Sequence, residues 1–142
     1  MIMKRSVIVG LAVIVALPVC VSARQASGTA DPRLSDPAFI KARDEALAAA
    51  KCPDRTEPVA ITTPKAQYPA VLRGSGVSGT ALTESIILPD GHLAFSRVMS
   101  TTSPEFGQAA LEVLKRYRYK PGTCGGRPVP RFVTVTITFA AH

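Results

Sequence analysis

The clearest pattern along the chain is a run near the C-terminus in which apolar and hydroxyl side chains alternate. The apolar positions are Val133, Val135, Ile137 and Phe139, and the hydroxyl positions are Thr134, Thr136 and Thr138. Alternation with a period of two is typical of a strand that has two different faces. We therefore predict a strand that ends on Phe139, with one apolar face and one hydroxyl face.

A helical pattern precedes this strand. One stripe at helical spacing contains Ala110, Leu111, Leu114, Tyr117 and Arg118. The segment Thr101 to Glu105 offers capping hydroxyls and a proline at the start, and Pro121 cannot continue a helix. Gly122 allows the left-handed backbone that commonly follows a helix. The pattern predicts a helix that begins near Pro104 and stops before Pro121.

Two further strands are predicted upstream. Residues Thr80 to Leu88 and Leu93 to Met99 are strand-like and flank Pro89-Asp90-Gly91, a sequence suited to a tight turn. The order is thus hairpin, helix, strand. The predicted fold class is α+β: a small three-stranded antiparallel sheet with the helix packed on one face. A right-handed crossover past the first strand would place the last strand at the open edge.

The N-terminal half contains one predicted helix of its own. Ser35-Asp36-Pro37 is a start signal, because a capping side chain precedes a proline in the first turn. We predict a separate helix over about 36–51, followed by an extended stretch that contains several prolines. The predicted organisation is residues 1–23 as a targeting segment, 24–64 as a linker with this helix, and 65–142 as the domain.

Residues 1–23 have the pattern of an export signal. Lys4 and Arg5 precede an apolar run of roughly eleven residues, and Val21-Ser22-Ala23 offers small residues for cleavage after Ala23. Two alternatives remain, an uncleaved membrane anchor and lipidation at Cys20, although Val19 is bulky for a lipoprotein site. Each route places the rest of the chain outside the cytoplasm.

Cleavage would remove Cys20 and leave two cysteines, Cys52 and Cys124. An even pair in an oxidising compartment favours a disulfide. We predict that Cys52 and Cys124 form one, which would tie the segment before the domain to the turn after the main helix. The alternative is two unrelated free thiols.

Several function classes find little support. The sequence has no paired acid and base, no nucleophile with a base, and no metal-ligand spacing, so we predict no enzymatic activity, no cofactor and no metal site. The glycines of residues 74–79 match G-x-G-x-x-G, but they precede a strand instead of following one, which argues against a dinucleotide site. They are interpreted as a flexible turn.

The chain is basic, with a formal net charge of +7, of which Lys4 and Arg5 supply two. A nucleic-acid-binding module is one alternative, because basic residues alternate with tyrosines near the end of the helix. The basic positions are Lys115, Arg116, Arg118, Lys120, Arg127 and Arg131. Cations are favoured near a helix C-terminus in any case, and export removes most nucleic acid from reach. We therefore predict protein partners and no nucleic acid.

Several short motifs in a fixed order carry a family resemblance. They are QYP at residues 67–69, Gly79, Asp90-Gly91, Ala110-Leu111, RYRYKPG at 116–122, GRPV at 126–129 and a strand that ends on Phe139. With these, the chain resembles the C-terminal domain of TonB, the periplasmic energy transducer of Gram-negative bacteria. The likeness runs from about Gln67 to Phe139, with Tyr117 and Tyr119 where the family usually has Trp and Phe.

The resemblance implies a binding function in the periplasm. In the family, this domain binds a short extended segment of an outer-membrane receptor by adding it as a strand. Residues 132–139 contain no Lys, Glu or Pro that would guard such an edge, so a homodimer through the same edge is also possible. The partner-binding residues implied are Gln67, Tyr68, Pro69, Phe132, Thr134, Thr136 and Thr138. Alternatively, the threonines only mark a solvent-facing surface.

Two departures separate the chain from a complete transducer. The family's anchor generally carries a histidine that serves the ExbB–ExbD motor, and residues 6–23 contain none. The family's linker is long, whereas about thirty flexible residues here span roughly 30 Å. The predicted function is an exported, periplasmic TonB-like binding module related to transport across the outer membrane. The alternative is a short transducer with a single inner-membrane anchor that works with ExbB–ExbD.

Overall fold

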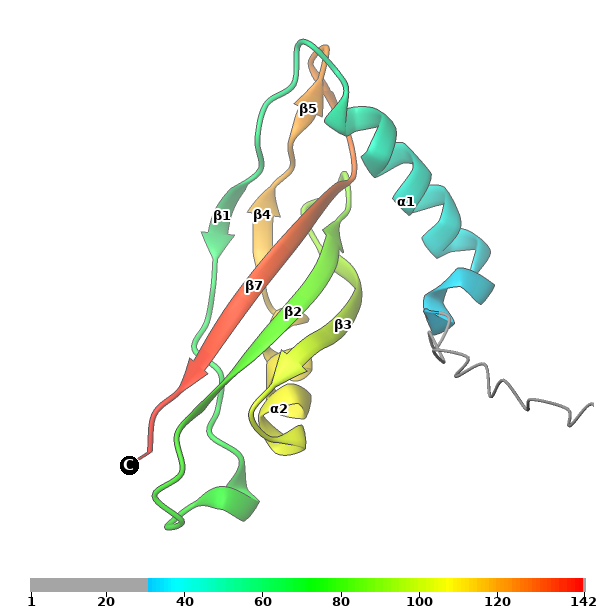
Figure 1. The fold of residues 1–142 in the computed structure, drawn as a ribbon. Helices are drawn as coiled ribbons and strands as arrows, with labels where there is room; N and C mark the ends of the chain where they lie inside the picture. The colour runs from blue at the N-terminus through cyan, green and yellow to red at the C-terminus, as the bar shows by residue number, and fades with distance from the viewer. Residues whose placement is uncertain (1–30, 142) are drawn as a thin grey trace, which may run out of the picture.

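The computed structural model describes residues 31–141 (Figure 1). The helices are two short 3-10 turns at Pro32–Ser35 and Ala70–Leu72, α1 (Pro37–Ala50) and α2 (Pro104–Leu114). The strands are β1 (Val59–Thr62), β2 (Gly79–Ile87), β3 (Leu93–Thr101), β4 (Arg118–Lys120), β5 (Thr123–Cys124), β6 (Arg127–Pro128) and β7 (Arg131–Phe139). The predicted targeting segment and its alternatives fall on residues 1–23, which lie outside the described residues.

The centre of the fold is an antiparallel sheet with the strand order β3-β2-β7. The predicted α+β class and the place of the last strand at a sheet edge are therefore confirmed. The predicted hairpin turn is also present, and Gly91 in it has a φ of +85°. A Cβ on Gly91 would lie 2.1 Å from the carbonyl oxygen of Tyr119, so a glycine is required at this contact.

The main core lies between the sheet and α2. The Phe106 ring stacks on Phe139 with centroids 4.7 Å apart and meets the edge of Tyr68 at 5.6 Å. Ile137 and Phe139 are buried, whereas the threonines of β7 are exposed. The two-faced strand predicted from alternation is thus confirmed, and its apolar face is the one that α2 covers.

Helix α2 begins at Pro104 as predicted, but the capping at its start and its C-terminal end differ from the prediction. Ser103 precedes the helix, but its hydroxyl bonds to the Glu105 carboxylate instead of capping a backbone N–H. The helix ends at Leu114, well before Pro121, and residues 118–120 form β4. Tyr119 donates its N–H to the Gly91 carbonyl at 2.9 Å, and β4 pairs with β1. These long-range strand contacts outweigh the local helical pattern.

Helix α1 covers part of the other face of the sheet. Asp36 accepts from the Ala38 N–H at 2.8 Å, as the predicted start signal requires. Phe39 and Ala42 pack against Ile86, which is paired with Phe132 of β7. The helix predicted at 36–51 is therefore present, and it docks on the hydroxyl face of β7, away from α2 (Figure 1).

An ion cluster fastens the N-terminal end of α1 to the sheet. Arg33 bonds to Asp31 at 2.7 Å and to Glu84 at 2.8 Å, and Arg97 contacts both carboxylates at 3.1 Å. The Arg33 guanidinium also lies 4.4 Å from the centre of the Phe39 ring. Hydrogen bonding from Arg33 lowers the pKa of Asp31 from 3.8 to about 2.

This cluster predicts a specific acid sensitivity. Because the pKa of Asp31 is depressed in the folded chain, its stabilising contribution is present above about pH 4 and is lost as the pH falls through 2. We expect Asp31→Asn to have a lower melting temperature than the wild type at pH 6, with the difference disappearing towards pH 2. Thermal melts of both proteins across this range measure it. An equal difference in melting temperature at pH 6 and at pH 2 would contradict this role for Asp31.

The proline-containing stretch after α1 is more structured than an extended linker. Val59–Thr62 form β1, which pairs antiparallel with β4 although all four residues are exposed. The described residues include no helix long and apolar enough to cross a bilayer. The division into linker and domain at residue 64 stays a prediction.

Candidate partner-binding site

The two edges of the central sheet differ in regularity. Along β3 the register with β2 shifts twice, and Phe95 has a φ of 53°, which is unusual for a residue with a side chain. Along β7, every residue from Arg131 to Phe139 pairs with β2 without a shift. Bulges twist an edge away from further pairing, so the β7 edge is the one suited to an added strand.

The backbone groups that face this edge can be identified from the pairing. The Thr80 N–H donates to the Thr102 hydroxyl, and the Thr80 C=O accepts from the Thr102 N–H. Both groups of Thr80 therefore face the β3 side and not Thr138, the β7 residue with which Thr80 is paired. In an antiparallel pair, hydrogen-bonded and non-bonded positions alternate. The backbone N–H and C=O groups of Thr134, Thr136 and Thr138 therefore point away from β2, towards the open edge.

A groove runs beside the C-terminal half of β7. One wall is the segment Thr63–Ala66, the other is Thr136–Ala140, and Tyr68 and Tyr117 complete the lining. We call this the partner groove, and its volume is about 500 Å³. Lys65 is the charged residue in this lining, which contains no carboxylate. The partner groove thus combines free backbone groups, apolar rings and one exposed cation.

Burial affects the ionisation of two tyrosines, Tyr117 in the lining of the partner groove and Tyr119 on β4. Tyr117 is buried, and burial raises the pKa of its hydroxyl. Burial also raises the pKa of Tyr119 on β4. Both side chains are therefore uncharged at neutral pH, and they offer apolar surface with a polar hydroxyl tip.

The sequence-predicted residues fall into three places. Tyr68, Thr136 and Thr138 line the partner groove. Gln67 and Pro69 border a neighbouring hollow against α2, which also contains Arg73 and Arg116. Phe132 and Thr134 are exposed farther along β7, on the face where α1 docks.

The sequence prediction did not include the wall Thr63–Ala66 or the buried ring of Tyr117. Pro64 belongs to the linker that the sequence predicts, because no local pattern indicates that β1 pairs with β4. The adjoining QYP motif was the available signal, since it makes the residues just before it candidates for the same site.

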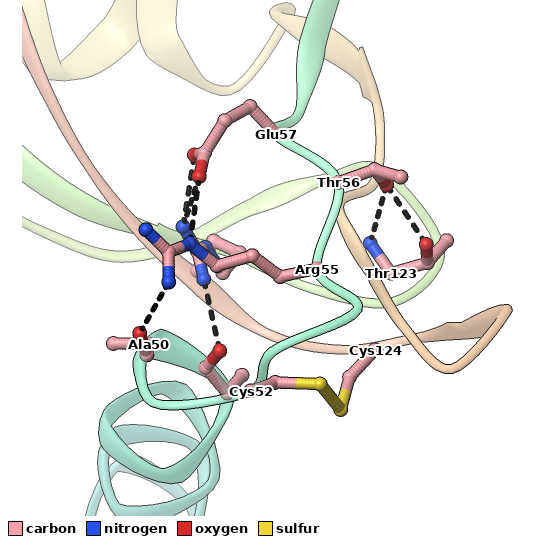
Figure 2. Close-up of a disulfide and its surroundings, with 9 residues drawn as sticks. Ala50, Cys52, Arg55, Thr56, Glu57, Thr123 and Cys124 are labelled. Atoms are coloured by element: carbon pink, nitrogen blue, oxygen red, sulfur yellow. Dashed lines mark hydrogen bonds and ion pairs between the residues drawn. A yellow bond between two sulfur atoms is a disulfide. The ribbon is translucent and has the colours of Figure 1, made fainter.

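The end of α1 and the residues after it hold both β5 and the start of β7, and Figure 2 shows the disulfide among these contacts. Cys52 and Cys124 form the predicted disulfide, with an S–S length of 2.07 Å and Cα atoms 5.9 Å apart. Arg131 bonds to both carboxylate oxygens of Glu57 at 2.7 and 2.8 Å and to the Ala49 carbonyl at 3.1 Å. Hydrogen bonding from Arg131 lowers the pKa of Glu57. These bonds fix the N-terminal end of the open edge.

Within residues 31–141, His, Cys, Asp and Glu side chains form no group of three or more that could hold a metal ion. The described site offers backbone hydrogen-bonding groups, aromatic surface and the positive charge of Lys65.

Comparisons with known proteins agree with this architecture. The family model described as Gram-negative bacterial TonB protein C-terminal matches residues 64–141. Protein TonB of Vibrio cholerae serotype O1 is 28% identical over 74 residues, which are 51% of this chain and 30% of the Vibrio protein. The matched region is therefore less than a third of that relative.

The fold is also similar to a solved structure, the solution NMR structure of the Pseudomonas aeruginosa TonB CTD. The TM-score is 0.53 with 20% sequence identity, and the match covers 61% of this chain and 89% of the other. At this identity, the similarity concerns the fold alone. The family model matches more than half of the residues of this chain. The chain therefore belongs to the family of the Gram-negative bacterial TonB protein C-terminal domain.

Proposed function

We propose that this protein is a periplasmic, TonB-like binding module that captures an extended segment of an outer-membrane receptor as a strand beside β7. The observation that carries the proposal is the unbroken β7 register, which leaves the backbone groups of Thr134, Thr136 and Thr138 in order along an open edge. An incoming strand can pair with such groups through its main chain, while its side chains supply specificity.

The lining of the partner groove suggests which segments would fit. An added strand lies about 4.8 Å from β7, and its alternate side chains would point towards Tyr68 and Tyr117. Apolar side chains suit those positions because they bury ring surface. Lys65 at the opposite wall favours a segment with an acidic residue near one end.

A direct test uses the protein purified from the periplasm and synthetic peptides from the plug domains of TonB-dependent receptors, with scrambled peptides as controls. We expect the amide NMR signals of Thr134, Thr136 and Thr138 to shift on titration with at least one plug peptide. Binding that instead perturbs β3, or the absence of binding across the panel, would refute capture at this edge.

The N-terminal segment decides between two versions of this function. In the first, cleavage after Ala23 releases a soluble periplasmic module. In the second, the segment stays as an inner-membrane anchor, and the protein is a short energy transducer that works with ExbB–ExbD. N-terminal sequencing of the protein from cells separates them, because a start at Arg24 excludes the anchor and a start at Met1 excludes cleavage.

A further inference from the structure

The wall of the partner groove belongs to a segment that is fastened at two points. Upstream, Cys52 is bonded to Cys124 of β5. Downstream, Tyr68 packs on Phe106 in the main core. Between these points the chain passes through β1 and forms the wall Thr63–Ala66. The position of the wall therefore depends on both fastenings.

The non-covalent contacts between the two fastenings lie mostly at the surface, apart from Ala66, which packs against the main core. β1 pairs with one neighbour, and its Val59 and Ile61 side chains are 59% and 69% exposed. Glu57 also holds Arg131 through both of its carboxylate oxygens, and the two side chains are 67% and 12% exposed, so the pair is open to solvent on the Glu57 side alone. This pair fixes the start of β7 and not the wall, and a short two-stranded ribbon such as β1–β4 is marginal by itself.

The hydrogen bonds that Thr56 makes with Thr123 are also exposed to solvent. Its N–H donates to the Thr123 carbonyl at 2.9 Å, and its hydroxyl lies 2.8 Å from the Thr123 hydroxyl (Figure 2). Such bonds exchange readily with solvent, so they give a modest net gain. The covalent bond is the strong restraint on this part of the chain.

The disulfide lies beside the surface at its Cys124 end, whereas Cys52 is buried. Cys124 is half-buried, and the next two residues, Gly125 and Gly126, form an exposed turn. A small dithiol can attack the Cys124 sulfur through its thiolate and then close to its own disulfide. The Sγ–Sγ bond breaks, two electrons and two protons pass to the protein, and both cysteines end as thiols.

We propose that the Cys52–Cys124 disulfide is a redox-sensitive control of partner capture. In the oxidised chain it holds the lead-in to β1, and thereby fixes the wall Thr63–Ala66 beside β7. In the reduced chain the segment 53–66 loosens, while the sheet and α2, which the disulfide does not join, keep their packing. The binding part of this inference rests on the proposed function, whereas the loosening of the wall does not.

Two measurements test the proposal on oxidised protein, on protein reduced with dithiothreitol, and on Cys52→Ser/Cys124→Ser. Amide hydrogen exchange should speed up over residues 53–66 on reduction and stay slow in β2 and β7. The affinity for a plug-domain peptide that binds the oxidised protein should fall by about tenfold or more, because four wall residues must then be ordered on binding. The double variant should match the reduced wild type.

A matched control separates the wall from helix α1. Arg33→Ala loosens α1 at its other end, where Arg33 meets Glu84, and leaves segment 52–66 intact. This variant should bind the peptide as the wild type does. Equal exchange in residues 53–66 of the oxidised and reduced proteins would overturn the inference, as would equal peptide affinity in the two states.

The two hypotheses can fail separately. If no peptide binds the oxidised protein, the proposed function fails and hydrogen exchange alone decides the role of the disulfide. If reduction unfolds the sheet as well, exchange in β2 will rise together with that in residues 53–66, and the claim of a local effect is wrong.

Discussion

Replacing Thr136 by proline is expected to abolish capture of the partner segment while the domain stays folded. The N–H of Thr136 faces the open edge, so its loss removes a donor to the added strand and none to β2. The ring of proline would also meet the incoming backbone. We expect at least a tenfold weaker peptide affinity, equivalent to about 1.4 kcal/mol. Isothermal titration with a binding plug peptide measures it.

Two comparison variants make this result interpretable. Thr136→Ala removes the hydroxyl but keeps the N–H, so its peptide affinity should stay close to that of the wild type. Val135→Pro removes a donor that faces β2, and should therefore lower the melting temperature. Wild-type binding by a folded Thr136→Pro protein would exclude strand addition at this edge.

The second large effect concerns stability. Phe106 has no exposed surface and stacks on Phe139, with its ring edge near Tyr68. Phe106→Ala would leave a cavity between α2 and the sheet. We expect the free energy of unfolding to fall by about 3–5 kcal/mol, as for other buried phenylalanines. Urea unfolding of the oxidised protein, followed by circular dichroism, measures this loss.

Val71→Ala is the matched control, because the Val71 side chain is 78% exposed and should contribute less than about 0.5 kcal/mol. A loss below about 1 kcal/mol in Phe106→Ala would mean that the main core is not centred on this ring. Because Tyr68 borders both Phe106 and the partner groove, peptide affinity in Phe106→Ala also reports how far the core positions the groove.

Patterns that depend on near neighbours in the sequence predicted most of the fold. The alternation of residues 133–139 identified β7 and its two faces, and Asp36-Pro37 marked the start of α1. The turn at Pro89-Asp90-Gly91 fixed the hairpin. In each case, local backbone preference and burial favour the same structure, so the prediction and the fold agree.

The features that were missed depend on contacts between distant residues. Residues 118–120 continue a helical pattern, yet Tyr119 pairs with Ala60 of β1 and bonds to Gly91. The wall of the partner groove follows from the same pairing. Neither contact leaves a periodic signal, because β1 is short and exposed on all four residues. Likewise, the docking of α1 depends on Ile86, whose burial on that face becomes visible only in the fold.

The irregular β3 edge has a consequence for stoichiometry. A chain with two regular edges could add copies of itself without limit, as fibrils do. Here the shifts in β3 and the φ of Phe95 disfavour pairing on that side, so β7 is the edge of the central three-stranded sheet that is left for association. Two chains that meet through β7 would use up both regular edges and stop at a closed pair. Self-association and partner capture would then be mutually exclusive, and each chain would carry one partner segment at a time.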